Sequence, residues 1–123
     1  MLLARLSLAA LVCVVLLPRG SAAEPISADE FRRELVGVPL CGAPDNGPYA
    51  GKMLCTVHLP DGTAVVAGQG MLVRGSWEAD GDKICRRNAN DPLERRRCIE
   101  YEKVGQDRYR NTDGINLCIG PCP

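Results

Sequence analysis

The amino-acid sequence predicts a small, mainly β domain: an antiparallel meander closing into a barrel-like sheet, with one short N-terminal helix and disulfide staples. Three observations predict this fold class. Short segments of alternating apolar and polar residues recur after residue 50, turns rich in Asp and Gly separate them, and six of the seven cysteines are spread between residues 41 and 122.

Residues 1–23 are typical of a signal peptide. Arg5 precedes an apolar run over residues 6–17, and residues 21–23 (Ser-Ala-Ala) place small side chains where signal peptidase cleaves. The run is too short and too poorly flanked for a transmembrane helix, so no stable membrane span is expected. The sequence therefore predicts an exported chain that begins at Glu24 and is periplasmic or secreted.

The remaining residues, 24–123, have the length of a single domain. The whole chain carries 15 basic and 15 acidic side chains, and loss of both leader arginines leaves the mature chain slightly acidic. This balance argues against a generally basic nucleic-acid-binding protein. Arginine outnumbers lysine, and Gly and Ala are common, which favours a bacterial origin.

One helix is predicted near the start of the mature chain. Ser27 and Glu30 have the spacing of a capping box, which satisfies backbone N–H groups at a helix start. Phe31 and Leu35 lie four residues apart and form a narrow apolar face that must dock on the rest of the domain. The helix is expected to end near Gly37.

The residues after this helix read as short strands joined by turns. Residues 51–59 alternate, and residues 60–62 (Pro-Asp-Gly) then form a turn in which glycine accepts a positive φ. Residues 63–77 give two strands that are interrupted near Gly68 and Gly70. With three further Asp/Gly turns, the chain has room for up to eight short strands after the helix. The two sides of residues 51–59 are Met53, Cys55, Val57 and Leu59 against Leu54, Thr56 and His58.

A disulfide between Cys85 and Cys98 explains the pattern around these residues. If the two cysteines face each other across an antiparallel ladder, an apolar pair (Ile84–Ile99) and an opposite-charge pair (Lys83–Glu100) follow without adjustment. A zinc site explains less, because the stretch offers two cysteines and no histidine. No metal site is therefore expected here.

The other four cysteines admit more than one pairing. The favoured pairing joins Cys41 to Cys55 across the first two strands and Cys118 to Cys122 in a small terminal loop. The alternative joins Cys41 to Cys118 or Cys122, which ties the chain ends and closes the barrel.

The same stretch resembles a group of small exported proteobacterial proteins and sensor-protein extensions. Their shared motif is Gly-Ser/Thr-Trp, an Asp/Gly turn, Ile/Leu-Cys, a polar insert, and a second Cys that opens a strand. The resemblance covers about the last two-thirds of the mature chain. It implies the fold and export but no function, because the group has no assigned biochemical activity. The matching positions are Gly75, Ser76, Trp77, Gly81, Asp82, Ile84, Cys85, Cys98, Ile99 and Tyr101.

Two segments are candidate contact surfaces for a ligand or partner. The loop at residues 42–52 contains Tyr49, an aromatic side chain among turn residues, which either binds a ligand or packs on the barrel rim. The polar insert is rich in arginine and suits an anionic partner, although such a run is more often a solvated loop. Its candidates are Arg86, Arg87, Arg95, Arg96 and Arg97.

The function predicted from these features is an exported, non-enzymatic binding or inhibitor-type module on a stapled β scaffold. Its partner would be a protein, an envelope component or a small ligand, and no cofactor is expected. The alternative is a small envelope hydrolase that uses His58, the single histidine, with a nearby carboxylate. No phosphate loop, dinucleotide fingerprint or nucleophile elbow occurs.

Overall fold

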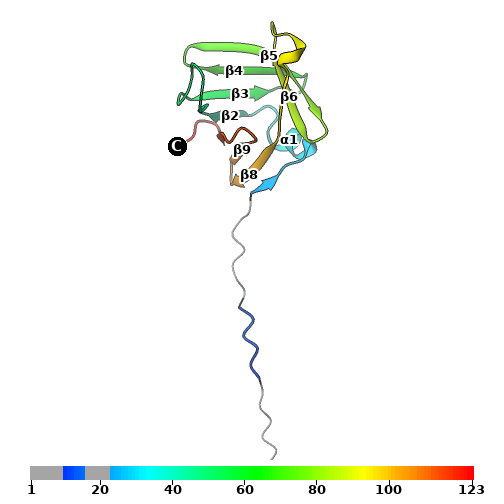
Figure 1. Cartoon of the computed structure of the whole chain (residues 1–123), viewed down its shortest axis with the longest axis vertical. Helices are drawn as coiled ribbons and strands as arrows, with labels where there is room; N and C mark the ends of the chain where they lie inside the picture. The colour runs from blue at the N-terminus through cyan, green and yellow to red at the C-terminus, as the bar shows by residue number, and fades with distance from the viewer. Residues whose placement is uncertain (1–9, 16–22) are drawn as a thin grey trace, which may run out of the picture.

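The computed structural model describes residues 10–15 and 23–123. Residues 10–15 have no regular secondary structure, and their apolar side chains are exposed; Leu11, for instance, is 89% accessible. They lie in an extended segment apart from the folded domain (Figure 1). Most of the predicted signal peptide lies outside the described residues, so its cleavage remains a prediction.

The predicted helix forms as α1, Ala28–Glu34. The Ser27 hydroxyl accepts a hydrogen bond from the Glu30 N–H at 3.2 Å, as the capping box requires. The helix ends three residues before Gly37, which adopts a φ of 82° and donates its N–H to the His58 carbonyl. This turn leads the chain from the helix into the sheet.

Among the described residues, ten strands form one antiparallel sheet, and a 3₁₀ turn (η1, Leu93–Arg95) lies in the polar insert. The strands are Glu24–Pro25 (β1), Pro39–Gly42 (β2), Leu54–His58 (β3), Thr63–Gly68 (β4), Met71–Asp80 (β5), Lys83–Asn88 (β6), Arg97–Ile99 (β7), Tyr101–Gly105 (β8), Arg108–Asn111 (β9) and Asn116–Ile119 (β10). The mainly β, barrel-like fold is thus confirmed. The strand count exceeds the expected eight because β1 adds a short edge and one long strand divides at Glu100.

The sheet is curled, and strands from its two opposite ends, β7 and β8, follow each other directly in the chain. The hydrogen-bonded order is β1-β8-β9-β10-β2-β3-β4-β5-β6-β7, and β7 and β8 are separated by Glu100 alone. At that residue the strand leaves β6 and joins β9: the Glu100 N–H donates to the Thr112 hydroxyl, and its carbonyl accepts from the Thr112 N–H. The expected Lys83–Glu100 pair is therefore not part of the ladder. The result is the curled sheet seen in Figure 1.

The register of the Cys85–Cys98 hairpin agrees with the prediction. Ile84 pairs with Ile99 one step along, on the inner face of the sheet. Disulfides join Cys41 to Cys55, Cys85 to Cys98 and Cys118 to Cys122. All three bonds are the favoured pairings.

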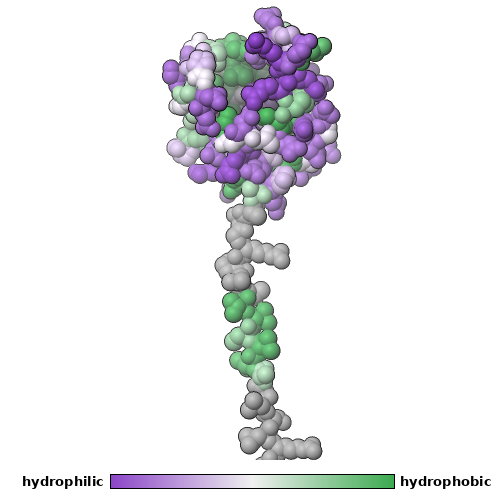
Figure 2. Space-filling view, viewed as in Figure 1, coloured by the Kyte–Doolittle hydropathy of each residue, from purple (hydrophilic) through white to green (hydrophobic). Residues whose placement is uncertain are grey.

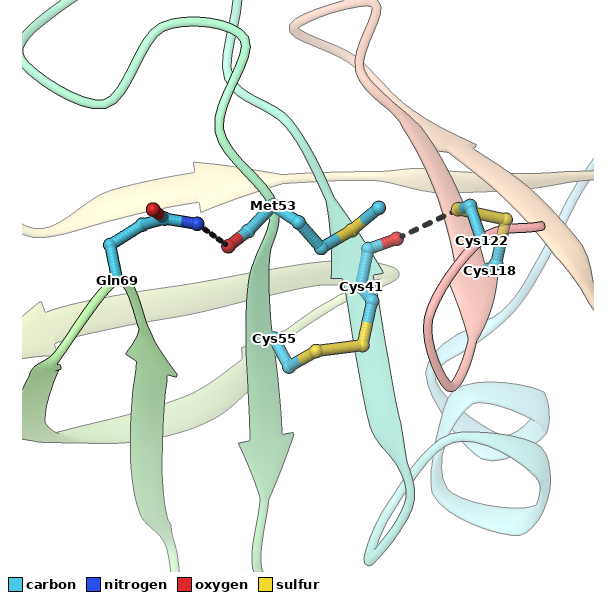
Figure 3. The surroundings of a disulfide bond; sticks show 6 residues. All are labelled: Cys41, Met53, Cys55, Gln69, Cys118 and Cys122. Carbon is cyan, nitrogen blue, oxygen red and sulfur yellow. Dashed lines mark hydrogen bonds between the residues drawn. A yellow bond between two sulfur atoms is a disulfide. The ribbon is translucent and has the colours of Figure 1, made fainter.

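Figure 3 shows why the alternative pairing was plausible. Cys41 lies between two strands and has Cys55 as register partner on one side and Cys118 on the other. The Cys122 sulfur lies 3.4 Å from the Cys41 carbonyl oxygen. Because that sulfur belongs to the Cys118–Cys122 disulfide, it has no proton to donate, and the approach is a van der Waals contact.

Helix α1 packs against the inner face of the sheet and supplies the centre of the core. Phe31 is 1% exposed, and its ring lies 5.1 to 5.6 Å from those of His58, Trp77 and Tyr101. Polar bonds hold the helix at both ends. The Ala28 N–H donates to Asp82, and the Tyr109 hydroxyl donates to Glu34. Within the described chain, no helix is long and apolar enough to cross a membrane.

Candidate functional site

The concave side of the sheet holds a hollow that α1 does not fill. Along β3, alternate residues point inward: His58 lies against the helix, whereas Leu54 and Thr56 line the hollow. Its volume is about 130 Å³. Figure 2 shows an opening over β3, β4 and β5, with apolar side chains at its floor and hydrophilic ones at its rim. The interior of the curled sheet is thus partly open to solvent.

Every strand except β1 and β5 contributes a side chain or backbone to this hollow. Half of the lining residues are aliphatic, and a few polar groups from different strands converge among them, a combination that small-ligand sites use. The aliphatic residues are Leu40, Leu54, Val66, Ile99, Ile115 and Leu117, and the polar ones are Thr56, Arg86, Tyr101 and Asn111.

Arg86 is the positive charge of the hollow. It follows Cys85 in β6, and the alternation of the strand turns it inward while Arg87 faces out. Its Nη1 donates to the Thr56 hydroxyl oxygen at 3.1 Å. Arg86 takes part in none of the ion pairs formed among residues 10–15 and 23–123. Its charge is therefore held by one neutral hydrogen bond, beside the aliphatic residues of the wall.

Tyr101 and Asn111 complete the polar lining and face each other across β8 and β9. Burial raises the pKa of the Tyr101 hydroxyl, and the Arg86 charge opposes this rise. The hydroxyl therefore stays protonated at neutral pH and can donate a hydrogen bond. The Asn111 side-chain oxygen accepts from the N–H groups of Asp113 and Ile115, which fixes the turn beside the opening.

His58 is a core residue in this structure. Its ring is 1% exposed and packs edge-on against Phe31 and Trp77. Neither ring nitrogen has a hydrogen-bond partner within the described part of the chain. Desolvation, together with the Arg86 charge, lowers the pKa of His58 to about 3. A general base must reach the proton that it takes, and no contact of this kind supports the hydrolase alternative.

The arginines of the polar insert do not gather into one cationic surface. Arg87 donates to the Asp91 carbonyl oxygen, Arg96 pairs with Glu78 at 2.9 Å, and Arg97 pairs with Asp113 at 2.8 Å. Arg95 is exposed in η1. Acidic neighbours therefore neutralise much of the run, as expected of a solvated loop.

Tyr49 lies in the loop between β2 and β3, where its carbonyl accepts from the Lys52 N–H. It is half-buried and does not line the interior hollow, although Pro44 of the same loop does. Of the six predicted contact residues, the structure places Arg86 alone in this hollow. Sequence reasoning missed the remaining lining residues, although the alternation in β3 already put Leu54 and Thr56 on the side of His58.

Larger hollows lie elsewhere but carry less specific chemistry. One of about 300 Å³ beside β1 and β8 is lined by Glu102 and Arg110, which pair with each other at 3.3 Å. Glu100, the third charged residue of its lining, takes part in none of the ion pairs among the described residues, so the unpaired charge of this hollow is negative. Among the described residues, no three His, Cys, Asp or Glu side chains gather to hold a metal ion.

Searches of protein-family models, of curated proteins and of solved structures return no match for this chain. The resemblance drawn from the Gly75–Tyr101 motif thus stays a prediction. The functional interpretation depends on the geometry of the hollow.

Proposed function

We propose that this protein is an exported, non-enzymatic binding module that holds a small ligand in the interior hollow. The observation that carries the proposal is the convergence of eight strands on one partly open, aliphatic hollow with an unpaired arginine. Structural cores are usually filled by side chains, so an open interior with converging polar groups favours a binding role.

The stapled frame supports the same proposal. The disulfides fix neighbouring strands: β2 to β3 through Cys41–Cys55, and β6 to β7 through Cys85–Cys98. All four of these strands line the hollow. A wall held in this way loses little conformational entropy when a ligand binds, which favours affinity. Disulfides of this number in so small a domain are also typical of an oxidising, extracytoplasmic environment.

The test is a titration with small amphiphiles followed by amide chemical shifts in NMR. The probes are benzyl alcohol, hexanamide and hexanoate. We expect at least one of them to shift the amides of β3, β4 and β10, which border the hollow. If none of the three shifts these amides, the proposed function is wrong.

A matched pair of variants locates the binding. Val66→Phe places a ring in the hollow, whereas Val65→Phe places the same ring on the outer face of the same strand. The first variant should abolish the shifts, and the second should keep them. Equal binding by both variants would place the ligand elsewhere on the protein and contradict the proposal.

A further inference from the structure

The chemical class of the ligand follows from the charge in the hollow. An arginine stays protonated at any physiological pH, and a charge on an apolar wall is costly until an opposite charge compensates it. Arg86 has no carboxylate partner among the described residues. An anion that entered the hollow would supply the partner that the protein lacks.

The remaining donors suit a planar carboxylate. The guanidinium has five N–H donors, of which one serves the Thr56 hydroxyl oxygen. The others can grip two oxygens side by side, the bidentate geometry that arginine forms with carboxylates. Because the Thr56 oxygen accepts from Arg86, its own proton is free for a further acceptor. The Tyr101 hydroxyl adds another neutral donor.

The charge count favours a monoanion. Among the residues that line the hollow, Arg86 is the sole cation, and no carboxylate is present. A carboxylate would leave the site neutral. A phosphate monoester carries nearly two negative charges at neutral pH, and the second charge would be left on an apolar wall without a partner.

The walls and the volume limit the rest of the ligand. An apolar cavity of about 150 Å³ accepts benzene, so a hollow of about 130 Å³ holds a group of similar size or slightly smaller. Leu54, Val66 and Leu117 offer it an aliphatic surface. An apolar body of about four to seven carbons gains from burial here, and a longer chain must leave through the opening.

We propose that the hollow binds a small monocarboxylate, its carboxylate held by Arg86 and Thr56 and its apolar body against Leu54, Val66 and Leu117. This inference rests on the proposed function, since it names the class of ligand for the same site.

Isothermal titration calorimetry on the disulfide-bonded protein tests it with hexanoate and its neutral counterpart hexanamide. Hexanoate should bind about tenfold more tightly or better, because a charge-assisted bidentate pair replaces neutral hydrogen bonds. Arg86→Met should remove this preference, so that hexanoate binds no more tightly than hexanamide. Arg87→Met is the matched control: it deletes the neighbouring arginine, which faces outward and bonds to Asp91, and should keep the preference.

The outcomes separate the two proposals. If hexanamide binds in the hollow as tightly as hexanoate, the protein is a binding module, but the carboxylate inference is wrong. The inference also fails if Arg86→Met still prefers hexanoate to hexanamide. It fails too if chloride or formate binds as tightly as hexanoate, because the apolar part of the ligand would then contribute nothing to affinity. The comparison of acid, amide and inorganic anion needs only the wild-type protein, so the test stands even if Arg86→Met does not fold.

Discussion

His58 should make this domain sensitive to acid, and the structure predicts by how much. The ring is buried between Phe31 and Trp77, its nitrogens have no hydrogen-bond partner among the described residues, and its pKa is lowered to about 3. In the unfolded chain the imidazole titrates at its ordinary pKa of about 6.5. At pH values between 3 and 6.5, the imidazole of His58 is protonated in the unfolded chain but neutral in the folded protein. The contribution to stability is therefore complete above pH 6.5 and is lost as the pH falls toward 3.

The magnitude follows from the two pKa values. Lowering the pH from 7 to 4 should remove about 3 kcal/mol of unfolding free energy through His58. Such a loss is a large part of the stability of a small domain. The assay is urea denaturation at both pH values, followed by the fluorescence of Trp77, the single tryptophan, whose ring lies 5.7 Å from that of His58.

His58→Leu provides the comparison, because it keeps an apolar group in the core and removes the titration. At pH 7 its effect has two opposing parts: the lost aromatic contacts, and the relief of two unpaired polar atoms. The diagnostic quantity is therefore the loss between pH 7 and pH 4, which should be about 3 kcal/mol smaller in the variant than in the wild type. Equal losses in the two proteins would refute the buried, neutral histidine.

Three further expectations concern the scaffold. Double alanine replacement of the Cys85–Cys98 bridge should lower the unfolding free energy by about 3 kcal/mol, and of the Cys118–Cys122 bridge by about 2 kcal/mol, since the closed loops differ in length (sequence separations of 13 and 4); equal losses in urea titrations would argue against the loop-closure account. Gly75→Ala should cost about 1–3 kcal/mol, because a Cβ there would overlap the backbone of β6, whereas at Gly105 it would meet its nearest side-chain atom at 3.8 Å and should be tolerated. Similar melting temperatures for the two glycine variants would contradict this packing. Ser27→Ala should lose about 1 kcal/mol in chemical denaturation, because the cap bond to the first turn of α1 disappears, and an unchanged midpoint would show that the cap is dispensable.

The elements that the sequence predicted well depend on neighbouring residues. The helix cap at Ser27 could be predicted because its hydrogen-bond partner, Glu30, lies three residues away in the sequence. The Ile84–Ile99 register followed from a single disulfide hypothesis, because alternation then fixes every other residue of the hairpin. The interruption between β7 and β8 at Glu100 could not be predicted, because it depends on a hydrogen bond to Thr112, which belongs to the opposite end of the sheet.

The candidate site shows the same division more sharply. The arginine run was predicted to be a solvated loop, with an anion-binding surface as the second interpretation. The fold turns Arg86 inward and pairs Arg96 and Arg97 with acidic residues. Sequence spacing alone could not supply this result, because Glu78 and Asp113 reach the loop from β5 and from the turn after β9. Whether an arginine is free or paired depends on residues that are distant along the chain.

The β class, the helix at residues 28–34, the Cys85–Cys98 bridge and the inner and outer faces of individual strands could be predicted from the sequence, whereas the pairing of the other four cysteines stayed open until the structure was known. These properties depend on turn chemistry, on the two-residue period of strands and on local hydrogen bonds, all of which are written in short stretches of residues. The tertiary structure decided that eight strands curl around a space larger than α1 fills, and that Arg86 points into it without a counterion among the described residues. A cavity forms only when the whole sheet curls, and the curvature of the sheet depends on the register and twist of every strand pair together.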